Sequence, residues 1–299
     1  MRHAILGPGG VGGLIAASLA QSGASVTLVL RKDAINQYPD TLRLESPFGK
    51  FSAKVDRATT VPAVDLLWIA VKATQLESAL DSFPSGNSVR AVIPLLNGID
   101  HVAMLRSRYG ASRVVPATIF VESERTAPGH IVHRSPFARL NVSSIGRSLI
   151  ETTLEDLQKV GFNCQFIEDE QTLLWSKLVF LGPMALVTTA AGKTSGEIAA
   201  DATWRRELEI CVREACGVAL AEGAKVDSDS VMSTIKGLPN NIRSSMQKDL
   251  EQGNLPELDA IAGPILRAAP RHNLDVPVTR RLVAEVERKT NARRSGQLG

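Results

Sequence analysis

The chain has 299 residues, a length that suits two compact domains better than one. Hydrophobic residues make up 44% and charged residues 22%, which is typical of a globular protein with a substantial core. The small net charge of +3 suits a phosphate-bearing ligand but does not predict a nucleic-acid-binding protein, which usually needs a clustered basic face. Three scattered cysteines without a CxxC pair predict reduced thiols in the cytoplasm, and the five histidines show no metal-ligand spacing.

The first half of the chain alternates strand and helix signals. HAILG is a buried-strand pattern with no signal peptide before it, and further apolar runs follow in SVTLVL, DLLWIAV and SVRAVIPLL. TLRLESPFGKFSAKV alternates around a Pro-Phe-Gly turn and predicts a hairpin. More strands are expected in VVPATIFVES, GHIVHR, ARLNVSSI and NCQFIED. Parallel strands joined by helices predict a doubly wound α/β domain over residues 1–168.

Only helical periods follow this region. They cover residues 173–192, 202–222, 228–236, 258–272 and 278–289, so we expect an all-helical second domain over residues 169–299. The first of these, LLWSKLVFLGPMALVTTAAG, is strongly apolar but carries Lys177. Once Lys177, the Gly-Pro pair and the threonines are counted, its apolar run is too short for a membrane span, so the sequence favours a buried core helix. Its Gly182-Pro183 pair is expected to bend or break that helix.

The segment GPGGVG, residues 7–12, matches the pattern GxGxxG between a predicted strand and a predicted helix. Gly7 permits a tight turn, Gly9 lets the backbone approach a pyrophosphate, and Gly12 lets helix and strand pack closely. Together with Gly10 and Val11 they form a loop whose N–H groups and helix dipole favour an anion. The alternative is a glycine-rich turn without a ligand. The position in the chain favours a Rossmann-type dinucleotide site.

The end of the second strand bears on the choice of cofactor. NAD-binding folds place an acidic residue there, whereas this chain has Arg31-Lys32, which favours the 2′-phosphate of NADP. The alternative is a pair of solvated loop charges. Lys72 and Asn97 follow two further strands, where they are candidates for the adenine-ribose phosphate and for the nicotinamide ribose or substrate. Both types are also ordinary in loops.

These residues together resemble a known family. GPGGVG, Arg31, VKATQ, LLNG, PGHIVH, WSKL, NIRSSMQKDL and ELD resemble the NADPH-dependent ketopantoate reductases (2-dehydropantoate 2-reductases), over essentially the whole chain. The resemblance implies a Rossmann domain, a helical domain and an active site between them. It implies Lys177 as catalytic general acid, with Glu257 helping to hold the substrate and the lysine.

The resemblance also assigns the polar residues around that lysine. It implies that Asn97 contacts cofactor ribose and substrate, and that Asn241 and Ser245 line the substrate site. One departure concerns the substrate. The family usually has asparagines four and eight residues after the lysine, and this chain has Leu181 and Ala185 there. A site without those amides should lose affinity for a substrate hydroxyl that needs them.

Three hypotheses follow for the function. The first is reduction of 2-dehydropantoate to pantoate in pantothenate biosynthesis, and the second is the same hydride chemistry on a more apolar 2-oxo acid or ketone. The third is a non-catalytic NADP-binding regulatory protein, against which the retention of Lys177 and Glu257 argues. We expect a small 2-oxo acid as partner, a cytoplasmic location, and neither nucleic acid nor membrane. A homodimer through the helical domain is left open.

Overall fold

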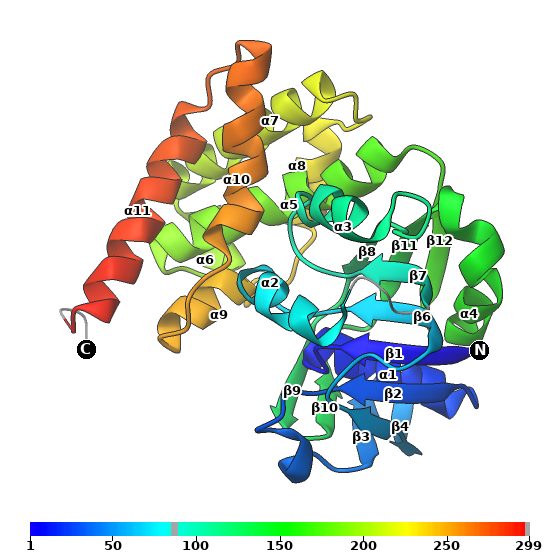
Figure 1. Ribbon diagram of the computed structural model, residues 1–299. Helices are drawn as coiled ribbons and strands as arrows, with labels where there is room; N and C mark the ends of the chain where they lie inside the picture. Colours follow the sequence, from blue (N-terminus) through cyan, green and yellow to red (C-terminus); the bar gives the residue numbers. More distant parts are fainter. Residues whose placement is uncertain (85–88, 297–299) are drawn as a thin grey trace. The chain divides into compact units, whose positions relative to one another are not determined.

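The computed structural model describes residues 1–84 and 89–296 (Figure 1). The chain divides into two compact units. One contains Met1–Leu96 and His101–Leu173, and the other contains Asn97–Asp100 and Leu174–Gly299. The short segment Asn97–Asp100 therefore belongs with the helical half of the sequence, although it lies in the first third of the chain.

A parallel five-stranded sheet forms the centre of the first unit, in the order β5-β2-β1-β6-β7. Its strands are β1 (Arg2–Leu6), β2 (Ser25–Val29), β5 (Asp56–Ala58), β6 (Val64–Ile69) and β7 (Val89–Pro94). Ser88, where one of the predicted strands starts, lies outside the described residues. The chain leaves β1 for β2 on one side and later returns to β6 on the other side. This reversal makes the carboxyl ends of β1 and β6 the expected ligand position of the sheet.

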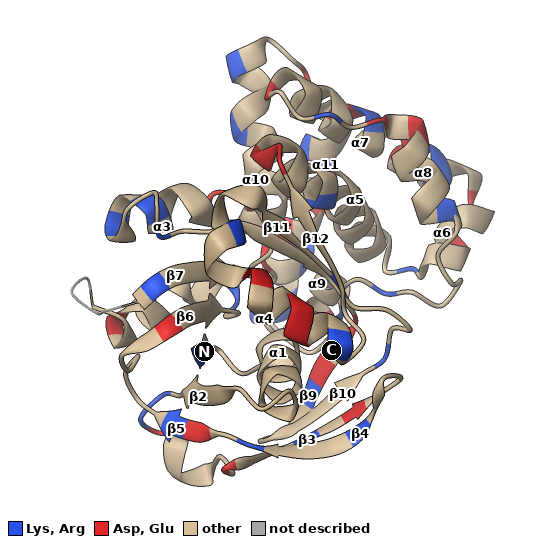
Figure 2. Ribbon diagram, turned by 90° about the vertical axis from the view of Figure 1, so that its right-hand side faces the viewer, with Lys and Arg blue, Asp and Glu red and all other residues tan. Residues whose placement is uncertain are grey.

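Helix α1 (Gly10–Gln21) packs between this sheet and a second one. The second sheet has the order β4-β3-β10-β9 and consists of β3 (Thr41–Ser46), β4 (Gly49–Lys54), β9 (Ser123–Ala127) and β10 (His130–His133). Figure 2 shows α1 between β2 on one side and β3, β9 and β10 on the other. Small residues in α1 allow this double contact, since a Cβ on Gly13 would lie 2.3 Å from Ile131 Cδ1.

A third sheet completes the first unit. Its order is β12-β11-β8, with β8 (Ala117–Phe120), β11 (Arg139–Ser143) and β12 (Asn163–Ile167). The remaining elements of this unit are η1 (Ile35–Gln37), η2 (Ala73–Gln75), α2 (Leu76–Ala79), η3 (Leu80–Ser82), α3 (His101–Tyr109), η4 (Ser144–Gly146) and α4 (Arg147–Lys159). The predicted hairpin is confirmed as β3 and β4. The later predicted strands are also present, but they form two additional sheets with antiparallel pairs that the sequence did not predict.

Among the described residues, the second unit is entirely helical, as predicted. Its elements are α5 (Glu170–Ala191, whose first four residues belong to the first unit), α6 (Ser195–Ala200), α7 (Ala202–Ala221), α8 (Ser228–Lys236), α9 (Ser245–Glu251), α10 (Leu258–Ala268), η5 (Ala269–His272) and α11 (Pro277–Arg294). Side chains cap several helix starts: Asp201 accepts from two N–H groups of α7, and Thr194 forms a capping box with Glu197. Apolar faces of α5, α7, α10 and α11 build the core of this unit.

The expected break at Gly182-Pro183 is wrong, because α5 continues through both residues. Pro183 has no N–H to donate, and its ring crowds the preceding turn. The helix persists because it is packed almost entirely against the core: Gly182 lies against α10, where a Cβ would be 3.5 Å from Ile265 Cδ1. Burial of this apolar helix outweighs the loss of one backbone hydrogen bond.

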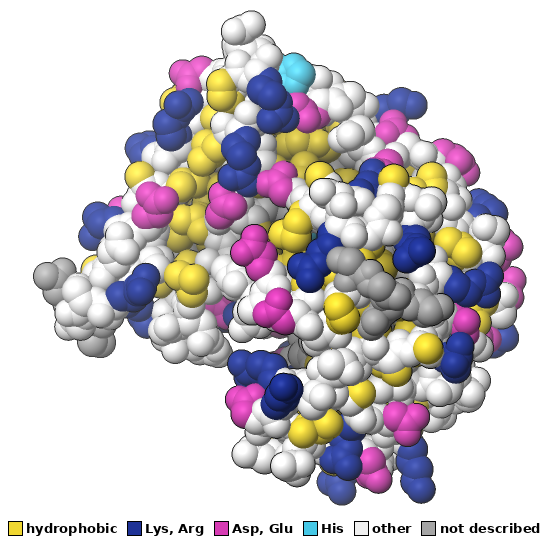
Figure 3. Space-filling model, in the orientation of Figure 1, with side chains coloured by type: hydrophobic (Ala, Val, Ile, Leu, Met, Phe, Trp, Pro, Cys, Tyr) yellow, Lys and Arg dark blue, Asp and Glu magenta, His cyan; other side chains and the backbone are white. Residues whose placement is uncertain are grey.

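Helix α5 is also the one described helix that is long and apolar enough to cross a membrane by length and composition. Of its most apolar window, 78% is buried, as in the core helix of a globular protein. The surface charges are mixed, and Figure 2 shows Lys and Arg interspersed with Asp and Glu along the helices. Figure 3 shows hydrophobic side chains gathered on one face over α10 and α11.

Candidate functional site

The glycine loop between β1 and α1 combines a tight turn with an open approach. Gly7 has a φ of +89°, and a Cβ there would lie 2.8 Å from the backbone N of Val71. A Cβ on Gly12 would lie 2.3 Å from Gly7 O, so close helix–strand packing requires that glycine. A Cβ on Gly9 would meet nothing within 4 Å. The internal packing of the protein therefore explains Gly7 and Gly12, whereas the bare Gly9 fits the approach of a ligand.

The start of α1 is suited to an anion. Gly9 is the N-cap residue, so no side chain caps the helix, and the first turn holds no acidic residue. The N–H groups of Gly10, Val11 and Gly12 therefore have no partner inside the helix. Ser123 on β9 closes the loop from the other side, where its hydroxyl donates to Gly10 O at 2.9 Å. This arrangement fits the pyrophosphate of a dinucleotide, bound by backbone donors and the helix dipole.

Two cations follow the strands that flank β1. Arg31 lies just after β2, and its side chain is 83% exposed, with only a loose ion pair to Asp33 at 3.9 Å. Lys72 lies after β6 as the N-cap residue of η2 and is half-buried. Because β1, β2 and β6 are adjacent and parallel, both residues lie at the same sheet edge as the glycine loop. The structure thus brings together most of the predicted cofactor residues.

Asn97 is the exception among those residues, because it lies in the second unit with Lys177 and Glu257. Lys177 Nζ donates to Asn97 Oδ1 at 3.2 Å, and Asn97 Nδ2 donates to Glu257 Oε2 at 3.0 Å. One amide therefore bridges a cation and a carboxylate that come from α5 and from the start of α10. Three of the predicted site residues form one chain of hydrogen bonds, although 160 positions separate Asn97 from Glu257.

The electrostatics of Lys177 suit proton transfer. Burial lowers the pKa of its ammonium to about 8, and the nearby charge of Glu257 opposes that shift. Glu257 itself is only 7% exposed. The lysine is thus charged at neutral pH but gives up its proton more readily than an exposed lysine. An ideal general acid has its pKa near the working pH, so this site has the properties of one.

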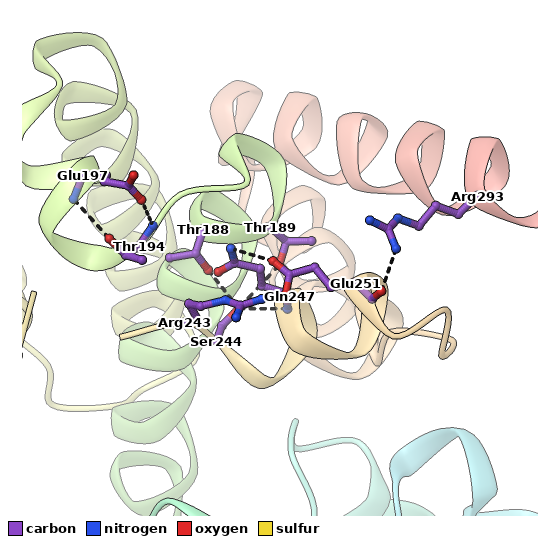
Figure 4. A network of polar contacts seen from close by, with 9 residues as sticks. All are labelled: Thr188, Thr189, Thr194, Glu197, Arg243, Ser244, Gln247, Glu251 and Arg293. Atoms are coloured by element: carbon purple, nitrogen blue, oxygen red, sulfur yellow. Dashed lines mark hydrogen bonds and ion pairs between the residues drawn. The ribbon is translucent and has the colours of Figure 1, made fainter. Parts of the chain in front are cut away.

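Asn241 and Ser245 lie elsewhere in the same unit. Both are exposed, and Ser245 is the first residue of α9. The hydrogen bonds of this region instead involve the neighbouring Ser244, whose hydroxyl caps α9 and accepts from Thr188 of α5 at 2.8 Å (Figure 4). Ser244 thus ties α9 to the same helix that carries Lys177, a connection that sequence reasoning missed.

The two positions that depart from the family pattern differ in their surroundings. Leu181 is half-buried, whereas Ala185 is fully buried in the core of the unit. Both lie on α5 with Lys177, four and eight residues further along. Residues four apart on a helix share a face, so Leu181 lies next to Lys177 and gives that surface an apolar character.

Two family profiles match this chain. "Ketopantoate reductase PanE/ApbA" matches residues 3–146, and "Ketopantoate reductase PanE/ApbA C terminal" matches residues 169–290. The chain belongs to the ketopantoate reductase family. A curated relative, the 2-dehydropantoate 2-reductase of Caulobacter vibrioides, is 30% identical over 292 residues, covering 94% of this chain and 96% of the relative.

Solved structures share the whole fold. A PanE/ApbA family ketopantoate reductase from Ralstonia eutropha matches with a TM-score of 0.88 and 26% identity over 98% of this chain and 100% of that one. A D-mandelate dehydrogenase, solved with NADH and anilino(oxo)acetate, matches with a TM-score of 0.86 over 98% and 99% of the two chains. At 22% identity, this second likeness shows the fold alone. Family membership makes this protein an oxidoreductase that acts on CH–OH/C=O groups with a nicotinamide cofactor.

Proposed function

We propose that this protein is an NADPH-dependent reductase of 2-oxo acids, with 2-dehydropantoate as the first candidate substrate and Lys177 as the general acid. The observation that carries the proposal is the hydrogen-bonded chain from Lys177 through Asn97 to Glu257. A cation held beside a buried carboxylate, on a fold with a dinucleotide loop, suits the reduction of a carbonyl group.

The chemistry assigns a role to each residue of this chain. The nicotinamide, when bound, supplies the hydride that a carbonyl carbon accepts. As negative charge develops on the carbonyl oxygen, the ammonium of Lys177 stabilises it and donates the proton. Asn97 orients the ammonium through its Oδ1, and Glu257 fixes the amide of Asn97 and favours the charged lysine. Asn241 and Ser245 are proposed as donors to the substrate.

The preference for NADP rests on Arg31. A guanidinium binds a 2′-phosphate through two parallel hydrogen bonds, whereas a carboxylate at this position would repel the phosphate. Arg31 is exposed and only loosely paired with Asp33, so its side chain is available for a ligand. Lys72, at the same sheet edge, is proposed to add positive charge. The bare Gly9 and the uncapped start of α1 are proposed to hold the pyrophosphate.

A specific observation favours a second substrate class. Leu181 lies half-buried one turn after Lys177, in place of an amide, and so it offers an apolar contact instead of a hydrogen-bond partner. A substrate with an apolar side chain would lose nothing there, while a hydroxylated one would leave its hydroxyl unpaired. The alternative is therefore reduction of a more apolar 2-oxo acid by the same residues.

A substrate panel tests both candidates. The oxidation of NADPH would be followed by the absorbance of the reduced nicotinamide, with 2-dehydropantoate and with 2-oxo acids bearing branched or aromatic side chains. Turnover of 2-dehydropantoate above the others supports the first candidate, and turnover of only the apolar acids supports the second. Tight NADPH binding without turnover of any of them would contradict both, and would favour a regulatory protein.

Two further expectations remain predictions. A cytoplasmic location agrees with three free cysteines, all of them buried. A homodimer through the helical unit agrees with the hydrophobic side chains that gather over α10 and α11 in Figure 3. Light scattering of the purified protein over a range of concentrations would measure the oligomeric state, and a constant monomer mass would contradict the second expectation.

A further inference from the structure

The loop that carries Asn97 is docked closely on the start of α10. Gly98 has a φ of +79°, and a Cβ there would lie 2.2 Å from the carbonyl oxygen of Ala260. Ile99 packs against the core of the helical unit. Together with the hydrogen bond from Asn97 to Glu257, these contacts place Asn97–Asp100 along the first turn of α10. The position of Asn97 therefore depends on how this loop is held.

Arg267 holds the far end of the loop. Its Nη2 donates to Asp100 Oδ2, and its Nη1 donates to Asp259 Oδ1 at 2.6 Å. Asp100 lies three residues after Asn97, and Asp259 lies two residues after Glu257. One guanidinium thus joins the two segments that supply Asn97 and Glu257, and hydrogen bonding to both carboxylates raises its own pKa.

The helix is shaped to accept this guanidinium. Asp259, Gly263 and Arg267 follow one another at intervals of four residues, so they lie on one face of α10. A Cβ on Gly263 would lie 2.3 Å from Arg267 Nη2 and 2.6 Å from its Cζ. The arginine side chain therefore lies back along the helix over the space that a side chain at position 263 would fill. Without Gly263, the guanidinium would have to move.

We propose that Arg267 is a positioning residue for the reductase reaction: lying across Gly263, it holds Asp100 and so keeps Asn97 between Lys177 and Glu257. The inference rests on the proposed role of Lys177. Arg267 also separates two carboxylates that would repel each other without a cation between them. Loss of the Arg267 side chain should make the loop more mobile, so that Asn97 would be hydrogen-bonded to Lys177 in only a fraction of the molecules. The turnover number should then fall, while cofactor binding in the first unit stays unchanged.

The decisive variant is Gly263→Ala, because it displaces the guanidinium without removing it. Alanine favours a helix over glycine, whereas the following Pro264 disfavours helical backbone at a residue with a Cβ, so the melting temperature of the variant has to be measured beside its activity. Apart from the neighbouring residues of the chain, the atoms that the new methyl group would meet are the far end of the flexible Arg267 side chain. A loss of activity without a loss of stability would therefore report the position of Arg267. Arg267→Ala removes the same contact directly. Arg267→Lys keeps the positive charge but cannot donate to Asp100 and Asp259 from two separate nitrogen atoms.

The experiment measures kcat, KM and melting temperature with NADPH and whichever 2-oxo acid the natural protein reduces. We expect Arg267→Ala and Gly263→Ala each to lower kcat about three- to tenfold, with the KM for NADPH unchanged. The double variant should lose no more than either single one, because both act on one contact. Arg267→Lys should recover part of the rate. The matched control is Arg288→Ala, which breaks an exposed pair with Glu285 on α11 and should leave kcat unchanged.

A second readout separates positioning from a general structural role. A looser loop admits water to Lys177, so the pH above which kcat falls should move upward in both variants. Unchanged kcat and pH profile in Gly263→Ala and Arg267→Ala would overturn the inference, as would an equal loss in Arg288→Ala. Both outcomes would leave the proposed function intact if the natural protein still turns over. No turnover by the natural protein would instead overturn the proposed function, and this inference with it.

Discussion

Asn97 donates to Glu257 across 160 positions of sequence, and the same amide accepts from Lys177. The hydrogen bond joins a short loop, which follows β7, to the N-cap residue of α10. Since an amide offers a donor and an acceptor at opposite atoms, it can link a carboxylate and an ammonium at the same time. The candidate site therefore contains three side chains in one chain of hydrogen bonds, and each of them can be tested separately.

Removing the lysine should abolish most of the turnover. We expect Lys177→Ala to lower kcat by about 10²- to 10⁴-fold, the usual contribution of a positioned general acid. NADPH affinity, measured by a fluorescence titration, should change little, because the glycine loop belongs to the other unit. The control is Lys159→Ala, since Lys159 lies on α4 and pairs with Asp156 at the surface. A Lys177→Ala variant with near-normal kcat would exclude this lysine as the proton donor.

The pH dependence of kcat should report the same lysine. Burial lowers the pKa of Lys177 to about 8, with Glu257 opposing that shift. A general acid acts in its protonated form, so kcat should be constant at neutral pH and fall above about pH 8. Glu257→Gln removes the charge that raises this pKa, so its break should move to lower pH. A break that does not move would mean that another group controls the rate.

The cofactor preference should follow Arg31. A charge-assisted hydrogen bond contributes about 1.5–3 kcal/mol, so Arg31→Asp should weaken NADPH relative to NADH by about 10- to 100-fold. The comparison of kcat/KM for the two cofactors measures this effect. Folding should not change, because Arg31 is 83% exposed. Arg113→Asp makes the same change of charge at another exposed position, in a turn of the first unit. This control should leave the ratio of kcat/KM for NADPH and NADH unchanged.

Two glycines of one loop should give opposite phenotypes. Gly9→Ala adds a methyl group that meets no protein atom, so the melting temperature should be kept while NADPH affinity falls. Gly12→Ala places its methyl group 2.3 Å from Gly7 O, so we expect a loss of roughly 1–3 kcal/mol in the free energy of unfolding. Thermal melts and fluorescence titrations distinguish the two. Unimpaired cofactor binding in Gly9→Ala would mean that no ligand approaches this glycine.

Substrate choice should respond to position 181. Leu181→Asn restores an amide at a half-buried position next to Lys177. We expect kcat/KM for 2-dehydropantoate to rise relative to apolar 2-oxo acids by about tenfold, as for one added hydrogen bond. Ala185→Asn is a poorer choice, because Ala185 is fully buried and a larger polar side chain there would destabilise the core. An unchanged ratio in Leu181→Asn would remove this position from the specificity argument.

Much of the fold could be predicted from local patterns. The glycine loop, the hairpin of β3 and β4 and the helix Ser228–Lys236 follow from residues that are close in sequence. The division of the later strands into separate sheets could not be predicted, because pairing between distant strands leaves no local pattern. The uninterrupted α5 was missed for a related reason: the local cost of Pro183 is offset by packing against α10, a helix that lies some 80 positions further along the chain.

The candidate site was predictable only in part. Lys177, Asn97 and Glu257 were found as members of a family pattern, and their direct contact depends on the folded unit. Arg267 was missed, because an arginine near the end of a helix is an ordinary solvated residue in most sequences. The spacing of Asp259, Gly263 and Arg267 could have indicated this residue. It places a glycine between an acidic and a basic residue on one face of a helix.

The membership of Asn97–Asp100 in the helical unit has a consequence for protein engineering. A fragment or chimera cut near residue 168 would separate this loop from its place on α10. The transplanted helices would then contact a loop from another protein. That loop would need a glycine at the position of Gly98, which lies against Ala260, and a carboxylate at the position of Asp100, which pairs with Arg267. If the helical unit selects the substrate, as proposed above, a chimera that exchanges this unit between relatives has to include Asn97–Asp100 together with the helices.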